Sequence, residues 1–364
     1  MSVNNGKKMP LGVKSTNFDS AGSAANGKAP AAASRKKLVI KPLKKQPVLS
    51  EEFLDRVWRE ELLPAVRAVQ TSDLQGVSYE RLYSKVEDLC THKFSQKLYD
   101  LLLAACDEHA RETMGRVSEC VTMDTMQFLQ VLSKAWNDHC SQIMIIRSIF
   151  LYLDRTYILN NAGSAHSVWD MGLACWLKYF RRYARLEDKA MTGTLQLIEL
   201  DRKQVSIDRV LLKSLLRMLS AIGLYLDLFE PSLLLQTEAF YGNESRELSV
   251  KLDVPSYLLH TEKRIREEME RSENYFEASS LKPLLHIVER AMISSCVDAL
   301  IEKGFESLCE QNRVQDLHRM YTLFARGNHV DGMGGRSESL AMMDARPDFT
   351  MQQASTNTPL GGSS

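Results

Sequence analysis

The sequence predicts an all-α protein in which helical units stack end to end between two unfolded ends. Apolar residues between 50 and 326 recur at spacings of three and four, which is the period of an amphipathic helix. Nothing in that range shows the sustained apolar and polar alternation of a strand. Roughly ten helices in about 275 residues are too many for one simple bundle and suit stacked units. With 44% hydrophobic residues in 364, the chain can bury real cores.

The first 49 residues are predicted to be a disordered basic tail. They are rich in Gly, Ala, Ser, Asn and Lys and contain ten Lys and Arg against a single acid, Asp19. Because the whole chain has a formal charge of zero, this segment carries +9 and the remainder carries −9. One short apolar island of β-forming residues interrupts the tail at Leu38, Val39, Ile40 and Leu43, without a helical partner in sequence.

The first expected helices follow this tail. A helical stretch from Glu51 to Val69 contains Pro64, which lacks a backbone donor and should kink or split the helix. Ser78 and Ser95 are placed to cap the next two helices. Their apolar faces are Leu82, Val86 and Leu89 in one and Leu98, Leu102 and Cys106 in the other.

The sharpest helical pattern lies between residues 129 and 153. Its apolar positions are Leu129, Leu132, Trp136, His139, Ile143, Ile146, Phe150 and Leu153. This spacing predicts about 37 Å of helix with one continuous buried seam. A coiled coil is the alternative, but Ile145, Ile149 and Leu151 widen the stripe beyond a two-stranded seam.

Two more helices have clear start and end signals in the sequence, and a second tail follows them. Asp208 is a natural N-cap for a helix that ends where Gly223 turns the chain outward. Pro283 suits the first turn of a helix expected to continue to Gly304. After Arg326 the sequence becomes rich in Gly and Pro without periodicity, so residues 327–364 are predicted to be disordered.

No motif indicates catalysis, a cofactor or a metal. The seven cysteines are widely spaced without a C-x-x-C pair, which fits a reducing compartment. There is no phosphate-binding G-x-x-x-x-G-K-[ST] sequence, and the eight histidines are dispersed. His139 lies in the apolar seam, where a hydrogen-bonded core histidine is expected. His286 and Glu289 have the spacing of di-iron bundles, but the further carboxylate-bearing helices are not evident.

The N-terminus has no signal peptide and the chain has no apolar run as long as a membrane span. A location in the cytoplasm and nucleus is therefore expected, without a membrane partner. The basic runs Arg35-Lys36-Lys37 and Lys44-Lys45 favour nuclear import over loose nucleic-acid binding, since a short tail binds phosphates weakly at physiological salt.

Two runs carry a family resemblance: Asp138–Tyr157 and Val168–Leu173 resemble a cullin. Further runs resemble the fourth cullin class, namely Lys36–Lys41, Ala65–Gln70, Val86–Lys93, Asp208–Ser220, Lys282–Leu285 and Glu310–Leu317. The resemblance covers about Arg35 to Ala325. Pro64 and the run Ala174–Lys178 depart from the family pattern, which suggests a divergent copy.

The resemblance implies the N-terminal part of a ubiquitin-ligase scaffold, built as an elongated stalk of five-helix cullin repeats. Repeat 1 would occupy residues 50–187, repeat 2 residues 188–304, and a stub of repeat 3 residues 305–326. The family's C-terminal half, which recruits the RING subunit and carries the modified lysine, has no counterpart here. We therefore expect a truncated, non-catalytic and competing form that binds no RING subunit. Its last helix should expose apolar residues for lack of neighbours: Leu317, Met320, Leu323 and Phe324.

The resemblance also implies the partner, a propeller-type damaged-DNA-binding adaptor that contacts the second and fifth helices of repeat 1. On this chain those positions are Leu82, Tyr83, Val86 and Glu87 in one helix and Val168, Trp169, Met171 and Gly172 in the other. The island at Leu38–Leu43 would add an extended segment in a groove of the adaptor. For Trp169 a core position is the alternative, and for the island a fortuitous apolar patch.

Two other function classes stay open: a helical nucleic-acid-binding or general protein-interaction protein, and an enzyme with an unrecognised site. Direct nucleic-acid binding is not expected from the folded body, because its charge is negative.

Overall fold

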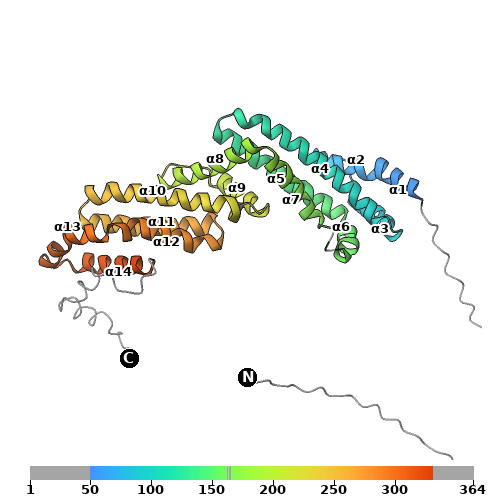
Figure 1. Cartoon of the computed structure of the whole chain (residues 1–364). Coiled ribbons are helices and arrows are strands. Elements are labelled where there is room, and N and C mark those ends of the chain that lie inside the picture. Colours follow the sequence, from blue (N-terminus) through green and yellow to red (C-terminus); the bar gives the residue numbers. More distant parts are fainter. Residues whose placement is uncertain (1–49, 162, 164, 331–364) are drawn as a thin grey trace, which may run out of the picture. The chain divides into compact units, whose positions relative to one another are not determined.

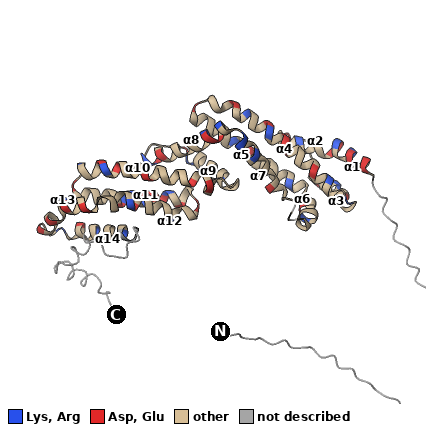
Figure 2. Ribbon diagram, in the orientation of Figure 1, with Lys and Arg blue, Asp and Glu red and all other residues tan. Residues whose placement is uncertain are grey.

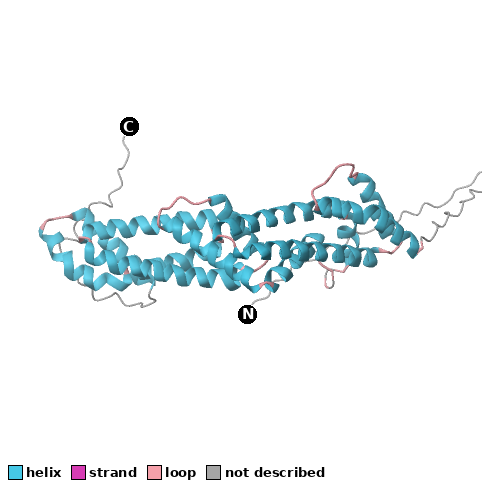
Figure 3. Ribbon diagram, turned by 90° about the horizontal axis from the view of Figure 1, so that it is seen from above, coloured by secondary structure: helices cyan, strands magenta, loops and turns pink. Residues whose placement is uncertain are grey.

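The computed structural model describes residues 50–330, except residues 162 and 164. Every regular element in this part of the chain is helical, so the expected all-α class is confirmed (Figures 1 and 3). The apolar island at Leu38–Leu43 and most of both predicted tails lie outside the described residues.

The first group of helices runs from residue 51 to residue 182. Its elements are α1 (Glu51–Val57), a π-helical turn η1 (Trp58–Leu62), α2 (Leu63–Gln70), α3 (Tyr79–Thr91), α4 (Ser95–Glu119), a 3₁₀ turn η2 (Cys120–Thr122), α5 (Thr125–Ile149), α6 (Leu151–Leu153), a π-helical turn η3 (Asp154–Ile158) and α7 (Val168–Arg182). Within the group, α5 packs against α2, α3, α4 and α7, and α7 also packs against α4.

The second group begins at residue 184. Its elements are α8 (Ala184–Arg202), α9 (Arg209–Ala221), a π-helical turn η4 (Tyr225–Phe229), α10 (Glu230–Lys251), α11 (Val254–Tyr275), η5 (Ala278–Ser280), α12 (Leu281–Met292), η6 (Ser294–Cys296), α13 (Val297–Glu310) and α14 (Val314–Val330). The two groups are joined where α8 and α9 pack against α5.

Pro64, predicted to kink or split its helix, does not end it, because a π-helical turn precedes the proline. Leu63 donates its N–H to the carbonyl of Trp58, five residues back, within the π-helical turn that precedes α2. Pro64 occupies the first turn of α2, where a missing backbone donor costs little. The chain therefore stays helical on both sides of the proline.

The long apolar seam is buried as predicted, although the helix is shorter than expected. All eight seam residues have exposed fractions of 5% or less. α5 ends at Ile149, because Phe150 leaves helical geometry at ψ 19°, and Leu153 lies in the separate turn α6. The seam therefore crosses a break in the backbone without leaving the core.

The structure confirms some of the predicted helix caps and contradicts others. The Asp208 carboxylate accepts from the N–H groups of Val210 and Leu211, and Gly223 has a positive φ of 73°, both as expected. The side chain of Ser78 makes no capping hydrogen bond, and Ser95 is the first residue of α4, not its cap.

The prediction of one continuous helix from Pro283 to Gly304 is wrong. It is interrupted after Met292, where Ile293 has φ −117° and ψ −70°, and α13 starts only at Val297. Ile293 is buried at 1% exposure and contacts the second core, so tertiary packing favours the break.

The four apolar residues of α14 that the sequence predicts to be exposed are buried. Leu317, Met320, Leu323 and Phe324 are between 0% and 6% exposed, because α14 packs against α11, α12 and α13. α14 also continues to Val330, beyond the expected end at Arg326. Gly327 permits this packing, since a Cβ there would lie 2.9 Å from Ile293.

The buried apolar residues form two clusters. The first extends from Leu54 to Leu233 and includes Phe276 and Leu284. The second extends from Tyr241 to Phe324, so the boundary between the clusters falls within α10. On the outside, Figure 2 shows positive and negative residues interspersed along the helices.

Among the described helices, none alone has the length and apolar character to cross a membrane. The segment of α9 together with η4 and α10 meets the length and composition test only as a pair bent by 107°. The apolar residues of α9 are accounted for by packing, since Leu212, Leu215 and Leu219 belong to the first core.

Candidate functional site

The predicted surface begins with α3, a helix with two distinct faces. Leu82, Val86 and Leu89 are buried against the core. On the adjoining side, Tyr79 is 41% exposed, Tyr83 is half-buried and Glu87 is exposed, and these three residues are spaced four apart along one face. α3 therefore presents an aromatic and acidic stripe.

The second part of the surface is the start of α7, where several hydrogen bonds hold the backbone. Ser167 caps the helix by accepting from the N–H of Asp170 and donating to its carboxylate at 2.7 Å. The buried Asp154 accepts the N–H of Val168 at 2.9 Å and pairs with Arg147. These bonds satisfy donors that a helix N-terminus otherwise leaves open.

Trp169 lies directly after these anchors. Its side chain is half-buried and packs against the first core, so part of the indole stays accessible. Val168 and Met171, at 0% and 1% exposure, point inward on either side of it.

The α5–α7 contact behind Trp169 is unusually close. A Cβ built on Gly172 would lie 2.7 Å from Cγ1 of Ile143, so only glycine fits at this position. His139 donates its Nε2–H to the carbonyl of Gly172 at 3.0 Å. Burial lowers the pKa of His139 to about 4, and the Gly172 carbonyl opposes this shift only in part. His139 is the hydrogen-bonded core histidine that the apolar seam predicts.

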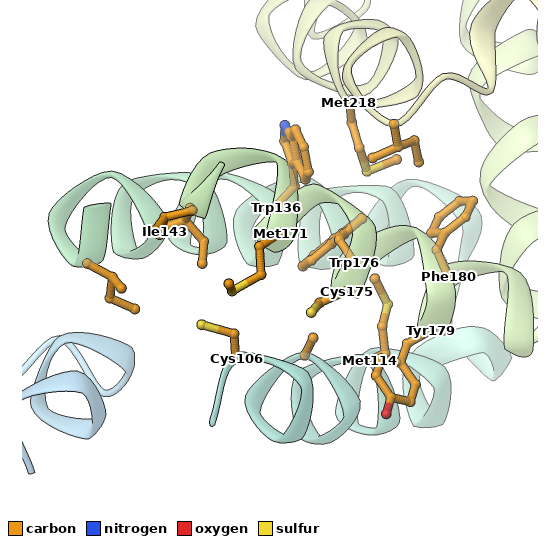
Figure 4. Packing of buried hydrophobic residues seen from close by; sticks show 14 of the residues in the cluster. Cys106, Met114, Trp136, Ile143, Met171, Cys175, Trp176, Tyr179, Phe180 and Met218 are labelled. Atoms are coloured by element: carbon orange, nitrogen blue, oxygen red, sulfur yellow. The ribbon is translucent and has the colours of Figure 1, made fainter. Parts of the chain in front are cut away.

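The same contact is filled by aromatic rings. The rings of Trp136 and Trp176 meet edge to face with centroids 5.3 Å apart, and the ring of His139 lies 4.9 Å from that of Trp176. Figure 4 shows Trp136 and Trp176 together with Met171, Cys175 and Cys106. Such packing makes α5 and α7 a rigid support for residues at the start of α7.

The two parts of the predicted surface are connected through α6 and the following turn. The ring of Tyr83 meets that of Tyr152 edge to face at 6.3 Å, and two residues after Tyr152 the Asp154 side chain bonds to α7. In Figure 1, α3, α6 and the start of α7 lie at the same end of the first group. Tyr83, Glu87 and Trp169 are thus accessible residues grouped around α6 and the turn that follows it.

The remaining predicted residues within the described chain are internal. Leu82, Val86, Val168, Met171 and Gly172 lie in the core and position the accessible residues. Leu38, Val39, Ile40 and Leu43 lie outside the described residues.

Sequence reasoning missed two accessible aromatic residues near this surface. Tyr79 lies one turn before Tyr83 on α3, and Tyr152 is half-buried beside Tyr83. Both are visible in the sequence, Tyr79 from its four-residue spacing and Tyr152 from its place in the Asp138–Tyr157 run. Their exposure depends on how α3 packs against α6, which no local pattern specifies.

The described residues do not form a metal site of three or more His, Cys, Asp or Glu side chains. Burial raises the pKa of Cys106 to about 12 and that of Cys175 to about 11, so both thiols remain protonated and are poor nucleophiles.

Comparison with known proteins agrees with this helical architecture. The family model described as the cullin alpha solenoid domain matches residues 59–338, which is over three quarters of the chain. The chain is 41% identical over 303 residues to Cullin-4A of Homo sapiens, covering 83% of this chain and 40% of that protein.

Two more distant relatives extend the comparison. The chain is 33% identical over 290 residues to Cullin-4 of Dictyostelium discoideum, covering 79% of this chain and 36% of that protein. It is 30% identical over 292 residues to Cullin-3B of Arabidopsis thaliana, covering 79% and 39%. The chain thus spans about 40% of the length of the curated relatives it matches. Since the family model covers most of the chain, the protein belongs to the cullin family, with a cullin-4-like sequence over the solenoid region.

Proposed function

We propose that this chain is a non-catalytic scaffold that binds a propeller-type damaged-DNA-binding adaptor through α3 and the start of α7. The observation that carries the proposal is the grouping of accessible Tyr83, Glu87 and Trp169 around α6, on helices that match the cullin pattern. In this role the chain would serve ubiquitin-dependent protein breakdown by holding the adaptor of a cullin-RING ligase.

The chemistry of the surface supports a protein partner. Aromatic residues that are partly supported by a core contribute strongly to interfaces, because they bury large area with little loss of side-chain freedom. Trp169 and Tyr83 have such support, from the first core and from Tyr152. Glu87, exposed one turn after Tyr83, supplies a charge that can select a partner.

The island Leu38–Leu43 is proposed to bind the same adaptor as an extended segment. A short run of β-forming residues gains backbone hydrogen bonds and side-chain pockets when it adds to a partner. The basic residues beside it favour nuclear import, so we propose that the chain resides in the nucleus and cytoplasm.

The direct test is binding of the purified chain to the purified propeller adaptor, measured by biolayer interferometry. We expect saturable binding that full-length human Cullin-4A competes away. The double variant Y83A/W169A should bind at least tenfold more weakly. The control L235A/V250A removes two apolar side chains that are 70% and 79% exposed on α10, and it should bind normally. Absence of binding, or equal loss in both variants, would overturn the proposal.

A further inference from the structure

A second surface lies between the two groups of helices, away from α3 and the start of α7. It is a groove of about 410 Å³ between α5, α9 and the end of α11. Its wall on α9 carries Arg209, Lys213 and Arg217, which are spaced four residues apart and therefore share one face of the helix. We propose that this groove binds an acidic peptide segment of a partner protein.

Two of the three basic side chains are available to bind a ligand. Lys213 and Arg217 are exposed, and neither forms an ion pair with any residue in the part of the chain that the structure describes. Arg209 differs, because it lies 3.6 Å from Asp201. Asp201 is already engaged by Arg271 at 2.7 Å, so it is shared between two guanidinium groups. The groove therefore has an unbalanced positive charge.

The floor of the groove adds polar donors on α5. Ser133 donates to Ser214, and Ser214 donates to Oδ1 of Asn137 at 3.3 Å, which leaves the NH₂ group of Asn137 as a donor. Trp136 also lines the groove. Figure 4 shows its indole nitrogen on the side of the ring away from Met171 and Cys175, toward α9. An acceptor-rich ligand fits these groups.

The surroundings favour a peptide over a nucleic acid. Tight nucleic-acid binding draws on many phosphate contacts, about six to ten, whereas the groove offers only three cations. The three cations span about 12 Å of helix, which matches about four residues of an extended peptide. Val210, 80% exposed on the same groove, offers an apolar contact that a peptide side chain can use.

The test uses the whole chain and two labelled probes in fluorescence anisotropy. One probe is a ten-residue peptide with six glutamates and two leucines, and the other is a single-stranded DNA of 20 nucleotides. The variant K213E/R217E removes the unpaired cations. The control R67E/K282E makes the same charge change at two exposed residues outside the groove that also form no ion pair within the described chain.

We expect the peptide to bind the wild-type chain, with affinity that falls as salt is raised. K213E/R217E should weaken this binding by roughly tenfold or more, while the control should stay within about twofold of wild type. Unchanged helicity and melting temperature show that both variants are folded. The proposal is overturned by absent peptide binding, by equal loss in both variants, or by tighter binding of the DNA that K213E/R217E abolishes.

Discussion

Arg202 and Glu268 form a two-point ion pair in which neither side chain has any exposure to solvent. Nη2 of Arg202 donates to Oε1 of Glu268 at 2.7 Å, and Nε donates to Oε2 at 3.3 Å. The pair joins α8 to α11, and Tyr241 of α10 donates its hydroxyl to the same carboxylate at 2.6 Å. Arg271 extends the network by pairing with both Glu268 and Asp201.

This network lies where the two apolar clusters meet, since Tyr241 is the first residue of the second cluster. A two-point ion pair is satisfied in one relative arrangement of its helices only, because both hydrogen bonds are directional. We therefore interpret the network as the contact that sets how α8 packs on α10 and α11. Burial raises the pKa of Glu268, but Arg202 and Arg271 outweigh this effect, so its net pKa lies below the ordinary value.

Replacing Glu268 with Gln is expected to destabilise the fold by about 3–5 kcal/mol, because the fully buried guanidinium group of Arg202 loses its counter-charge and Arg271 keeps only Asp201. The measurement is the free energy of unfolding in urea at pH 7. Glu273→Gln on the same helix is the control, and at an exposed position it should change stability by less than about 0.5 kcal/mol. Equal effects of the two substitutions would show that the network does not stabilise the protein.

His139 is expected to make stability depend on pH. Its pKa is lowered to about 4 in the folded chain, so between about pH 6.5 and pH 4 the unfolded chain binds a proton that the folded chain does not. Stability is then fully present above about pH 6.5 and is lost by about 3 kcal/mol as the pH falls to about 4. Urea unfolding at successive pH values measures this loss.

The variant His139→Gln should flatten this pH dependence, whereas His286→Gln, at an exposed position on α12, should leave it unchanged. A residual slope is expected from His109, whose pKa is also lowered by burial. If His139→Gln retains the full wild-type slope, the buried imidazole is not its source.

Gly172→Ala is expected to destabilise the chain by about 1–3 kcal/mol, because the added methyl group overlaps Ile143. Gly115→Ala on α4 is a matched control, since the nearest atom to its Cβ would be 3.9 Å away. That substitution should stabilise by about 0.4–1 kcal/mol through the lower entropy of the unfolded chain. Thermal unfolding compares the two variants. In the I143A background, the cost of Gly172→Ala should be smaller than in the wild-type chain, whereas the effect of Gly115→Ala should be the same.

Trp169→Ala should weaken the proposed adaptor complex by about 2 kcal/mol or more, as expected of an aromatic anchor. Because the indole also packs on the first core, the melting temperature of the free variant must be measured beside its dissociation constant. An unchanged dissociation constant with intact helicity would assign Trp169 to the core alone.

Deleting residues 34–45 should weaken the adaptor complex while leaving the melting temperature of the free chain unchanged. A segment that orders only on binding contributes nothing to the free fold. A drop of several degrees in the free protein would instead place the Leu38–Leu43 island within the fold.

The sequence by itself determined the helical class, the burial of the seam from Leu129 to Leu153 and the cap at Asp208. Each depends on residues within a few turns of one another, where helical period and backbone geometry decide the outcome. The resemblance located α3 and α7 but could not tell accessible from internal positions. Val168 and Trp169 are adjacent in sequence and differ only in which side of α7 they occupy.

Only the tertiary structure decided the features that join distant segments. The Arg202–Glu268 pair spans 66 residues, and the burial of Leu317 to Phe324 required α11, α12 and α13 as neighbours. The same holds for Gly172, whose necessity comes from Ile143 on another helix. A charged or small residue looks alike in sequence whether it faces water or a partner helix, because its energy depends on what packs against it.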